Sequence, residues 1–166
     1  MKHLVARFKK ALGDQKGFSL VELIIVIAIM AVLVGTVGAQ VIPYMNNAKK
    51  ARDIQILSSY ATAGVIAYSI RVEDVPAGLS TMTVVVTPGA GGDQFVCSDA
   101  QIVADEVKNL VAKDYLSETG KTFKSKDYHD VDKIEIVFDF DNHKVYVIGY
   151  VGATAIGNPD DVVAVL

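Results

Sequence analysis

Two histidines that lie beside carboxylates, His129 and His143, are the side chains in this sequence most suited to chemistry. Histidine sites need a second ligand or a partner base at a defined spacing, such as His-x-x-x-His on one helix face. Neither histidine has such a neighbour, so solvated turn positions explain both more simply. The single cysteine, Cys97, also has no recognisable partner and is expected to be a small, semi-buried residue beside a helix start. The sequence predicts no catalytic residue, no enzyme and no cofactor.

Carboxylates cluster in two short stretches whose composition resembles calcium loops, one around Asp127–Asp132 and one at Asp139, Asp141 and Asn142. Neither stretch has the glycine and the distal glutamate of an EF-hand. Asp139 and Asp141 remain the candidates for a calcium ligand, and no other metal site is predicted. Gly89–Gly92 lacks the following Lys-Ser/Thr of a phosphate loop and is expected to be a surface loop.

Charge and hydropathy divide the 166 residues into three parts. The first 17 residues carry five Lys and Arg against Asp14 alone, while the whole chain has a net charge of −3. The remainder is therefore acidic, which gives it no broad electrostatic reason to bind nucleic acid, and no nucleic-acid partner is predicted. A basic segment ahead of an apolar run is instead the orientation signal of a membrane protein.

The apolar run extends from Leu23 to Ile42 and contains no charged residue. Its length matches the roughly 20 helical residues that cross a hydrocarbon core. A secretory signal peptide would be shorter and would end in a small-residue cleavage site, and no clear site follows Ala39. Apolar residues then recur every three or four positions as far as Tyr68, so the pattern predicts one long helix from about Ser19 to Ile70.

The boundary before the apolar run has the sequence Lys16-Gly-Phe-Ser-Leu-Val-Glu22. A glycine, an aromatic residue and then a glutamate lie directly against the run, in that order. This stretch resembles the processing site of the type IV pilin family, and the resemblance covers about Lys9 to Arg52. Glycine suits a cleavage site because the absence of Cβ lets a protease approach the backbone closely.

The resemblance implies that a prepilin peptidase cuts between Gly17 and Phe18 and then methylates the new Phe18 amine. It implies three parts: a basic leader at 1–17, a hydrophobic rod or transmembrane segment at 18–47 and a globular pilin head at 48–166. The implied partners are the peptidase, membrane lipid before assembly, the pilus assembly machinery and identical pilin subunits in a helical polymer. The precursor would lie in the cytoplasmic membrane and the assembled subunit in an extracellular surface filament.

Glu22 places a carboxylate at the edge of the apolar run, where burial of a charge is unfavourable unless the charge finds a partner. The Phe18 amine created by cleavage is one such partner, in the same chain or in a neighbour, and Phe18 and Glu22 are the predicted assembly residues. The simpler alternative is an interfacial glutamate that favours the helix N-terminus.

The remaining sequence predicts an α+β head in which the amphipathic half of the long helix covers an antiparallel sheet, as in the ladle-shaped pilin fold. Met82–Thr87 is expected to be a short strand, residues 134–140 and 145–151 a hairpin turning at Asn142-His143, and Val162–Val165 an edge strand. A second helix is expected to start at a Ser98–Gln101 capping box and to end at Gly120.

Three functions fit this pattern. The first is a pilin subunit of a type IV pilus for adhesion, twitching motility or aggregation. The second is a pseudopilin of a type II secretion or competence DNA-uptake system, which would share the same processing site. The third is a plain signal-anchored membrane protein that is neither cleaved nor polymerised.

Overall fold

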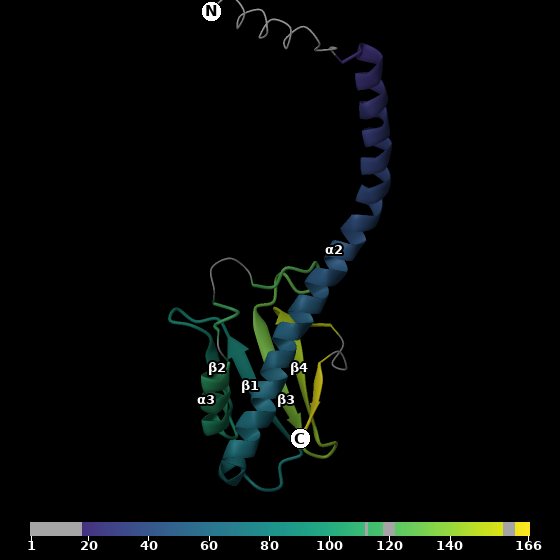
Figure 1. Cartoon of the computed structure of the whole chain (residues 1–166). Helices are drawn as coiled ribbons and strands as arrows, with labels where there is room; N and C mark the ends of the chain where they lie inside the picture. Colours follow the sequence, from purple (N-terminus) through teal and green to yellow (C-terminus); the bar gives the residue numbers. More distant parts are fainter. Residues whose placement is uncertain (1–17, 112, 118–121, 158–161) are drawn as a thin grey trace, which may run out of the picture. The chain divides into compact units, whose positions relative to one another are not determined.

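The longest element of the protein is α2, a 52-residue helix from Leu20 to Arg71 (Figure 1). The computed structural model describes residues 18–111, 113–117, 122–157 and 162–166. The predicted long helix is therefore confirmed, with ends within one residue of those expected. The chain divides between Pro43 and Tyr44 into two compact units. Tyr44–Leu166 is called the globular unit below.

The first half of α2 has apolar side chains on every side and no core of its own. Leu23 is 56% exposed, Ile42 is 65% exposed, and the side chains between them are similarly open. No polar face separates these residues, so this half of the helix has no amphipathic stripe by which it could pack on a single sheet. The Thr36 hydroxyl donates to the backbone oxygens of Val32 and Leu33, which satisfies it inside the helix.

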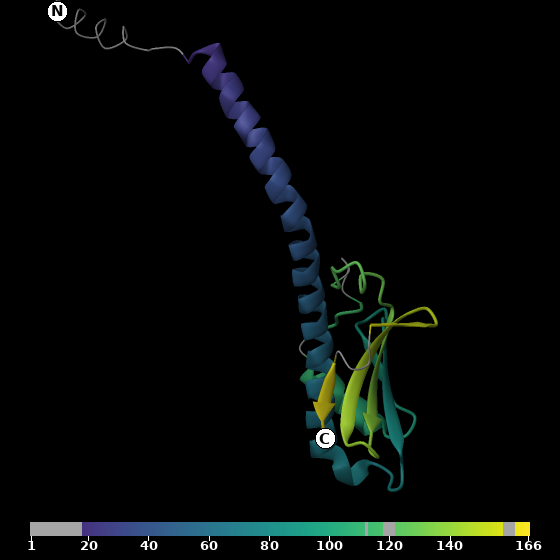
Figure 2. The ribbon, with the colours of Figure 1, turned by 90° about the vertical axis from the view of Figure 1, so that its right-hand side faces the viewer.

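Within the globular unit, α2 becomes amphipathic and buries one face against a sheet (Figure 2). Leu57, Tyr60 and Ala67 are almost fully buried at intervals of three and seven residues, as a helix packed by one stripe requires. Gly64 lies on the same face. A Cβ there would come within 3.1 Å of Ile136 Cγ2, so the missing side chain allows the helix to lie close to the sheet.

The sheet is antiparallel, with the strand order β2-β1-β3-β4-β5 and with β6 also paired to β4. A short 3₁₀ turn, η1 (Val72–Asp74), follows α2. The strands are β1 (Thr81–Thr87), β2 (Gln94–Val96), β3 (Lys133–Asp139), β4 (Lys144–Val151), β5 (Thr154–Ile156) and β6 (Val163–Val165). The α+β class with a helix on an antiparallel sheet is confirmed, as are the strand after Met82, the hairpin strands and the C-terminal edge strand.

The hairpin turn differs from the prediction. Asp139 pairs with Lys144, so four residues rather than two connect β3 to β4. His143 adopts a positive φ of 55°, and the Asn142 N–H donates to Asp139 Oδ1 at 3.0 Å. An aspartate that accepts from the backbone three residues on stabilises a longer turn than the Asn-His pair suggested.

The second helix, α3, runs from Gln101 to Leu110, and both of its predicted ends were wrong. Its N-cap is Ala100, with no side-chain capping bond, so Ser98 does not cap it. The Gln101 side chain instead accepts from the Cys97 N–H and donates to the Phe95 carbonyl, both at 3.0 Å. The helix ends ten residues before Gly120, which lies outside the described residues.

Candidate functional site

Phe18 and Ser19 precede the first helical residue and lie in open, non-helical backbone. The Phe18 side chain is 83% exposed. Gly17 lies outside the described residues, so the geometry of the predicted Gly17–Phe18 cleavage bond is not part of the structure described. On its C-terminal side, that bond is followed by Phe18 and Ser19, which directly precede the helix.

Glu22 has a partner inside its own chain. The Ser19 N–H donates to Glu22 Oε2 at 2.9 Å, and the Val21 N–H donates to Ser19 Oγ at 3.3 Å. The Leu23 N–H donates to the Ser19 carbonyl at 3.1 Å, the first bond of the helix. This reciprocal arrangement is a capping box, and the carboxylate also lies where the helix dipole favours negative charge.

The sequence contains the signal for this cap, Ser19-Leu-Val-Glu22, although only a charge partner for Glu22 and a favourable interaction with the helix N-terminus were predicted. The same pattern was assigned at Ser98, where the structure does not form it. Near Ser98, the Gln101 side chain instead hydrogen-bonds the backbone of Phe95 in β2 and of Cys97, which follows β2.

The helix that begins at this cap is long and apolar enough to cross a membrane, by length and composition. None of its most apolar 18-residue window is buried within the chain. A segment of this kind is stable in lipid or against other apolar surfaces, because in water it would expose a large area of hydrocarbon.

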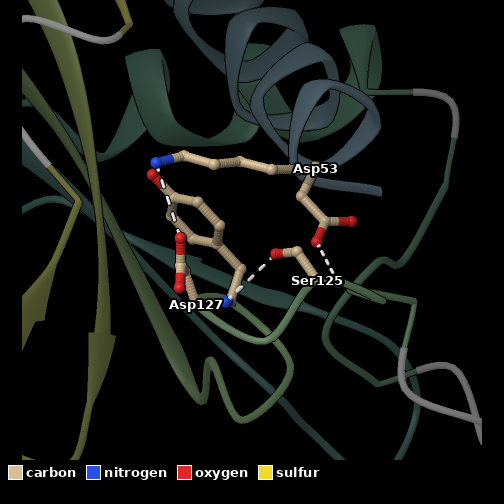
Figure 3. A network of polar contacts seen from close by, with 5 residues as sticks. Asp53, Ser125 and Asp127 are labelled. Carbon is tan, nitrogen blue, oxygen red and sulfur yellow. Dashed lines mark hydrogen bonds and ion pairs between the residues drawn. The ribbon is translucent and has the colours of Figure 1, made fainter. Parts of the chain in front are cut away.

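A buried carboxylate network fixes one loop of the globular unit to α2 (Figure 3). Asp53 on α2 is 0% exposed and accepts from the Ser125 N–H at 2.7 Å and from the Lys124 N–H at 3.1 Å. Ser125 Oγ in turn accepts from the Tyr128 N–H at 3.3 Å. One surface ion pair lies beside the network, between Lys50 and Asp127 at 3.4 Å.

Asp93 holds a second loop in the same manner. Its carboxylate is buried and accepts from the Leu116 N–H at 2.9 Å and from the Ser117 N–H at 2.6 Å. The Tyr60 hydroxyl donates to Asp93 Oδ2 at 3.4 Å. Burial, and then the negative charge of Asp93, raise the pKa of Tyr60 far above its ordinary value. Sequence reasoning missed both aspartates as anchors, because their backbone partners are distant in the chain.

Of the predicted calcium candidates, Asp139 is the last residue of β3 and Asp141 lies in the following turn. Asp139 accepts from both the backbone and the side-chain nitrogens of Asn142, at 3.0 and 2.8 Å, and these hydrogen bonds lower its pKa. Among the residues that the structure describes, no three His, Cys, Asp or Glu side chains are grouped to hold a metal ion. His129 Nε2 lies 2.7 Å from Asp130, and Cys97 is buried as a free thiol.

Comparison with known proteins gives one match. Residues 12–38 match the family model described as the prokaryotic N-terminal methylation motif. The match spans the end of the leader, the Gly17-Phe18 junction, the Glu22 capping box and most of the apolar run. No curated protein and no solved structure matched the chain.

The fold and the motif point in the same direction. A long apolar helix continues into an amphipathic one that packs on an antiparallel sheet, and the helix start carries the type IV prepilin signature. This signature supports a type IV pilin-like or pseudopilin-like precursor. The signature implies processing by a prepilin peptidase and a membrane-anchored precursor.

Proposed function

We propose that this protein is the structural subunit of a type IV pilus, assembled through its N-terminal helix into a surface filament for adhesion, motility or aggregation. The observation that carries the proposal is the exposed apolar half of α2 behind a prepilin signature. Lipid covers such a surface in the precursor. In a filament, the same surface of neighbouring subunits replaces the lipid, so each rod passes from one apolar environment to another.

In this proposal, cleavage between Gly17 and Phe18 creates a free amine close to Glu22. The carboxylate then leaves the Ser19 N–H or shares it, and pairs with the amine of a neighbouring subunit. Either charge alone is strongly disfavoured in an apolar core, so the two groups must lie within ion-pair distance of each other. The pairing would therefore fix the axial position of each incoming subunit.

The test compares filament yield for Glu22→Gln and Ser19→Ala in the native cell. Glutamine keeps a side-chain acceptor for the Ser19 N–H but removes the charge, so filaments sheared from the surface should fall about tenfold or more. Ser19→Ala removes the cap's hydroxyl and weakens the helix start by about 0.5–2 kcal/mol, yet keeps the charge. We expect it to retain most of the filaments. Equal yields from the two variants would contradict the pairing.

A pseudopilin of a secretion or DNA-uptake system would carry the same signature. The location of the polymer distinguishes the two functions. A pilin forms long filaments that can be sheared from the cell surface, whereas a pseudopilin polymer remains short and within the envelope.

A further inference from the structure

The two edges of the sheet in the globular unit differ in how their backbone groups are used. At one edge, a side chain from α3 closes β2. The Gln101 amide nitrogen donates to the Phe95 carbonyl, and its oxygen accepts from the Cys97 N–H, both at 3.0 Å. These bonds take the place that the backbone of a further strand would occupy, so this edge is blunted against another chain.

At the opposite edge, β6 directs backbone groups away from the sheet. The Val147 N–H donates to the Val162 carbonyl, so Val162 bonds toward β4. Alternate residues of an antiparallel strand bond to the same neighbour, so the N–H and C=O groups of Val163 and Val165 point away from β4. No hydrogen bond to these outward groups comes from any residue that the structure describes. This edge is therefore open where the β2 edge is closed.

The side chains of the β6 edge are also open. Ala164 pairs with the core residue Val145, so Val163 and Val165 lie on the other face of the sheet, away from α2. They are 43% and 74% exposed. Figure 2 faces this side of the molecule, and no helix or strand lies in front of β6. Proteins commonly protect such an edge with a charge or a proline, and β6 has neither, so it can serve as a template for a further strand.

We propose that the β6 edge pairs with the β6 edge of a second copy of the chain, so that the two sheets join antiparallel across a two-fold axis. Val163 of each copy lies opposite Val165 of the other. Each such pair exchanges N–H and C=O groups, which gives about four hydrogen bonds between the two backbones. The exposed valine side chains also pack across the junction, as β-branched pairs do between neighbouring strands.

Symmetry argues for a second copy through this same edge. A strand paired antiparallel with itself meets every outward donor with an acceptor, so the edge is complementary to itself. Pairing of β6 with β2 of another copy is opposed by Gln101, which closes the β2 edge. A two-fold pair cannot repeat along one polar helical filament, because neighbours there are related by a rotation and a rise. In the proposed pilus the contact would therefore join subunits of different filaments, where repetition strengthens a short contact.

The test traps the contact by disulfide formation in the full chain, dispersed in an excess of detergent micelles. Three variants each introduce one cysteine at an exposed valine: Val163→Cys, Val165→Cys and, on the closed edge, Val96→Cys. The variants are mixed in pairs in a glutathione redox buffer, and mass spectrometry of the peptides identifies each disulfide. Cys97 is buried in the unaltered chain and should not react.

The proposed pairing predicts a disulfide between position 163 of one copy and position 165 of the other. Directly opposite residues lie about 5.5 Å apart between Cα atoms, within reach of a disulfide, whereas diagonal neighbours lie about 7–8 Å apart. The mixed disulfide should therefore exceed those between like positions by about fivefold or more. Disulfides from position 96 should stay at the level of random collision, which makes Val96→Cys the matched control.

Equal amounts of every disulfide, position 96 included, would show random collision and overturn the proposal. Disulfides mainly between like positions would overturn it in favour of another pairing, and a dominant bond between positions 96 and 165 would do so in favour of sheet extension through β2. The absence of any disulfide would exclude the contact. None of these outcomes depends on leader cleavage or filament formation, so failure here leaves the proposed pilin function standing.

Discussion

At the scale of single residues, two buried aspartates hold irregular loops on a helical and stranded frame. Asp53 binds the backbone at 124 and 125, and Asp93 binds the backbone at 116 and 117. A carboxylate that accepts two backbone N–H groups replaces the hydrogen bonds that regular structure would supply. Each aspartate thus satisfies its own buried charge and fixes a loop at the same time.

Asp53→Ala tests this role. The substitution leaves the Ser125 N–H buried without its partner, and charged hydrogen bonds contribute about 1.5–3 kcal/mol each. We expect the free energy of unfolding of the globular unit to fall by about 2–4 kcal/mol, measured by denaturant titration of the full chain in detergent. Asp127→Ala is the matched control and should change it by less than about 1 kcal/mol, because the Lys50 pair is exposed. Similar losses in the two variants would contradict the assignment.

Tyr60 predicts how stability depends on alkaline pH. Its pKa in the folded chain is raised by burial and by Asp93, so the folded state keeps its proton where the unfolded chain loses it. Stability from this group is complete below the ordinary tyrosine pKa of about 10 and falls as the pH rises above it. Unfolding followed from pH 8 to 12 should show this loss, and Tyr60→Phe should reduce it. An unchanged alkaline profile in Tyr60→Phe would show that other groups are responsible.

At the scale of elements, the spacing of apolar residues correctly predicted those helices and strands that bury one face in the core. The long helix, the β3 and β4 strands and the short strand β1 all follow from the spacing of apolar residues, which the core then buries. β5 was missed because Thr154–Ile156 is three residues long and mostly exposed, so it carries no alternation. The predicted start of α3 was wrong because the Gln101 side chain bonds the backbone of Phe95 and Cys97 instead of completing a capping box with Ser98.

The start of α3 yields a prediction of its own. Gln101→Ala removes two hydrogen bonds between the helix and the end of β2, so it should destabilise the globular unit by about 1–2 kcal/mol. Ser98→Ala should change stability by no more than about 0.5 kcal/mol, since Ser98 is exposed and caps nothing. Denaturant midpoints of the two variants decide between the observed arrangement and a Ser98 capping box. The larger loss in Ser98→Ala would favour the box.

At the scale of the whole molecule, the sequence predicted the candidate site more fully than it predicted the loops. Gly17, Phe18 and Glu22 are contiguous with the apolar run, so their order alone carries the prepilin signature. The intrachain bond between Ser19 and Glu22 was not predicted, because the carboxylate was considered only as a charge that needs a partner or favours the helix N-terminus. The anchoring roles of Asp53 and Asp93 depend on contacts across the fold that no local pattern records.

We propose that the chain is a prepilin whose first 17 residues are removed before assembly. The most direct measurement is the intact mass and N-terminal sequence of the protein isolated from the surface of its own cells. We predict a chain that begins at N-methylated Phe18, without residues 1–17. A mature membrane-bound chain that still begins at Met1 would contradict the claim and would favour a plain signal-anchored protein.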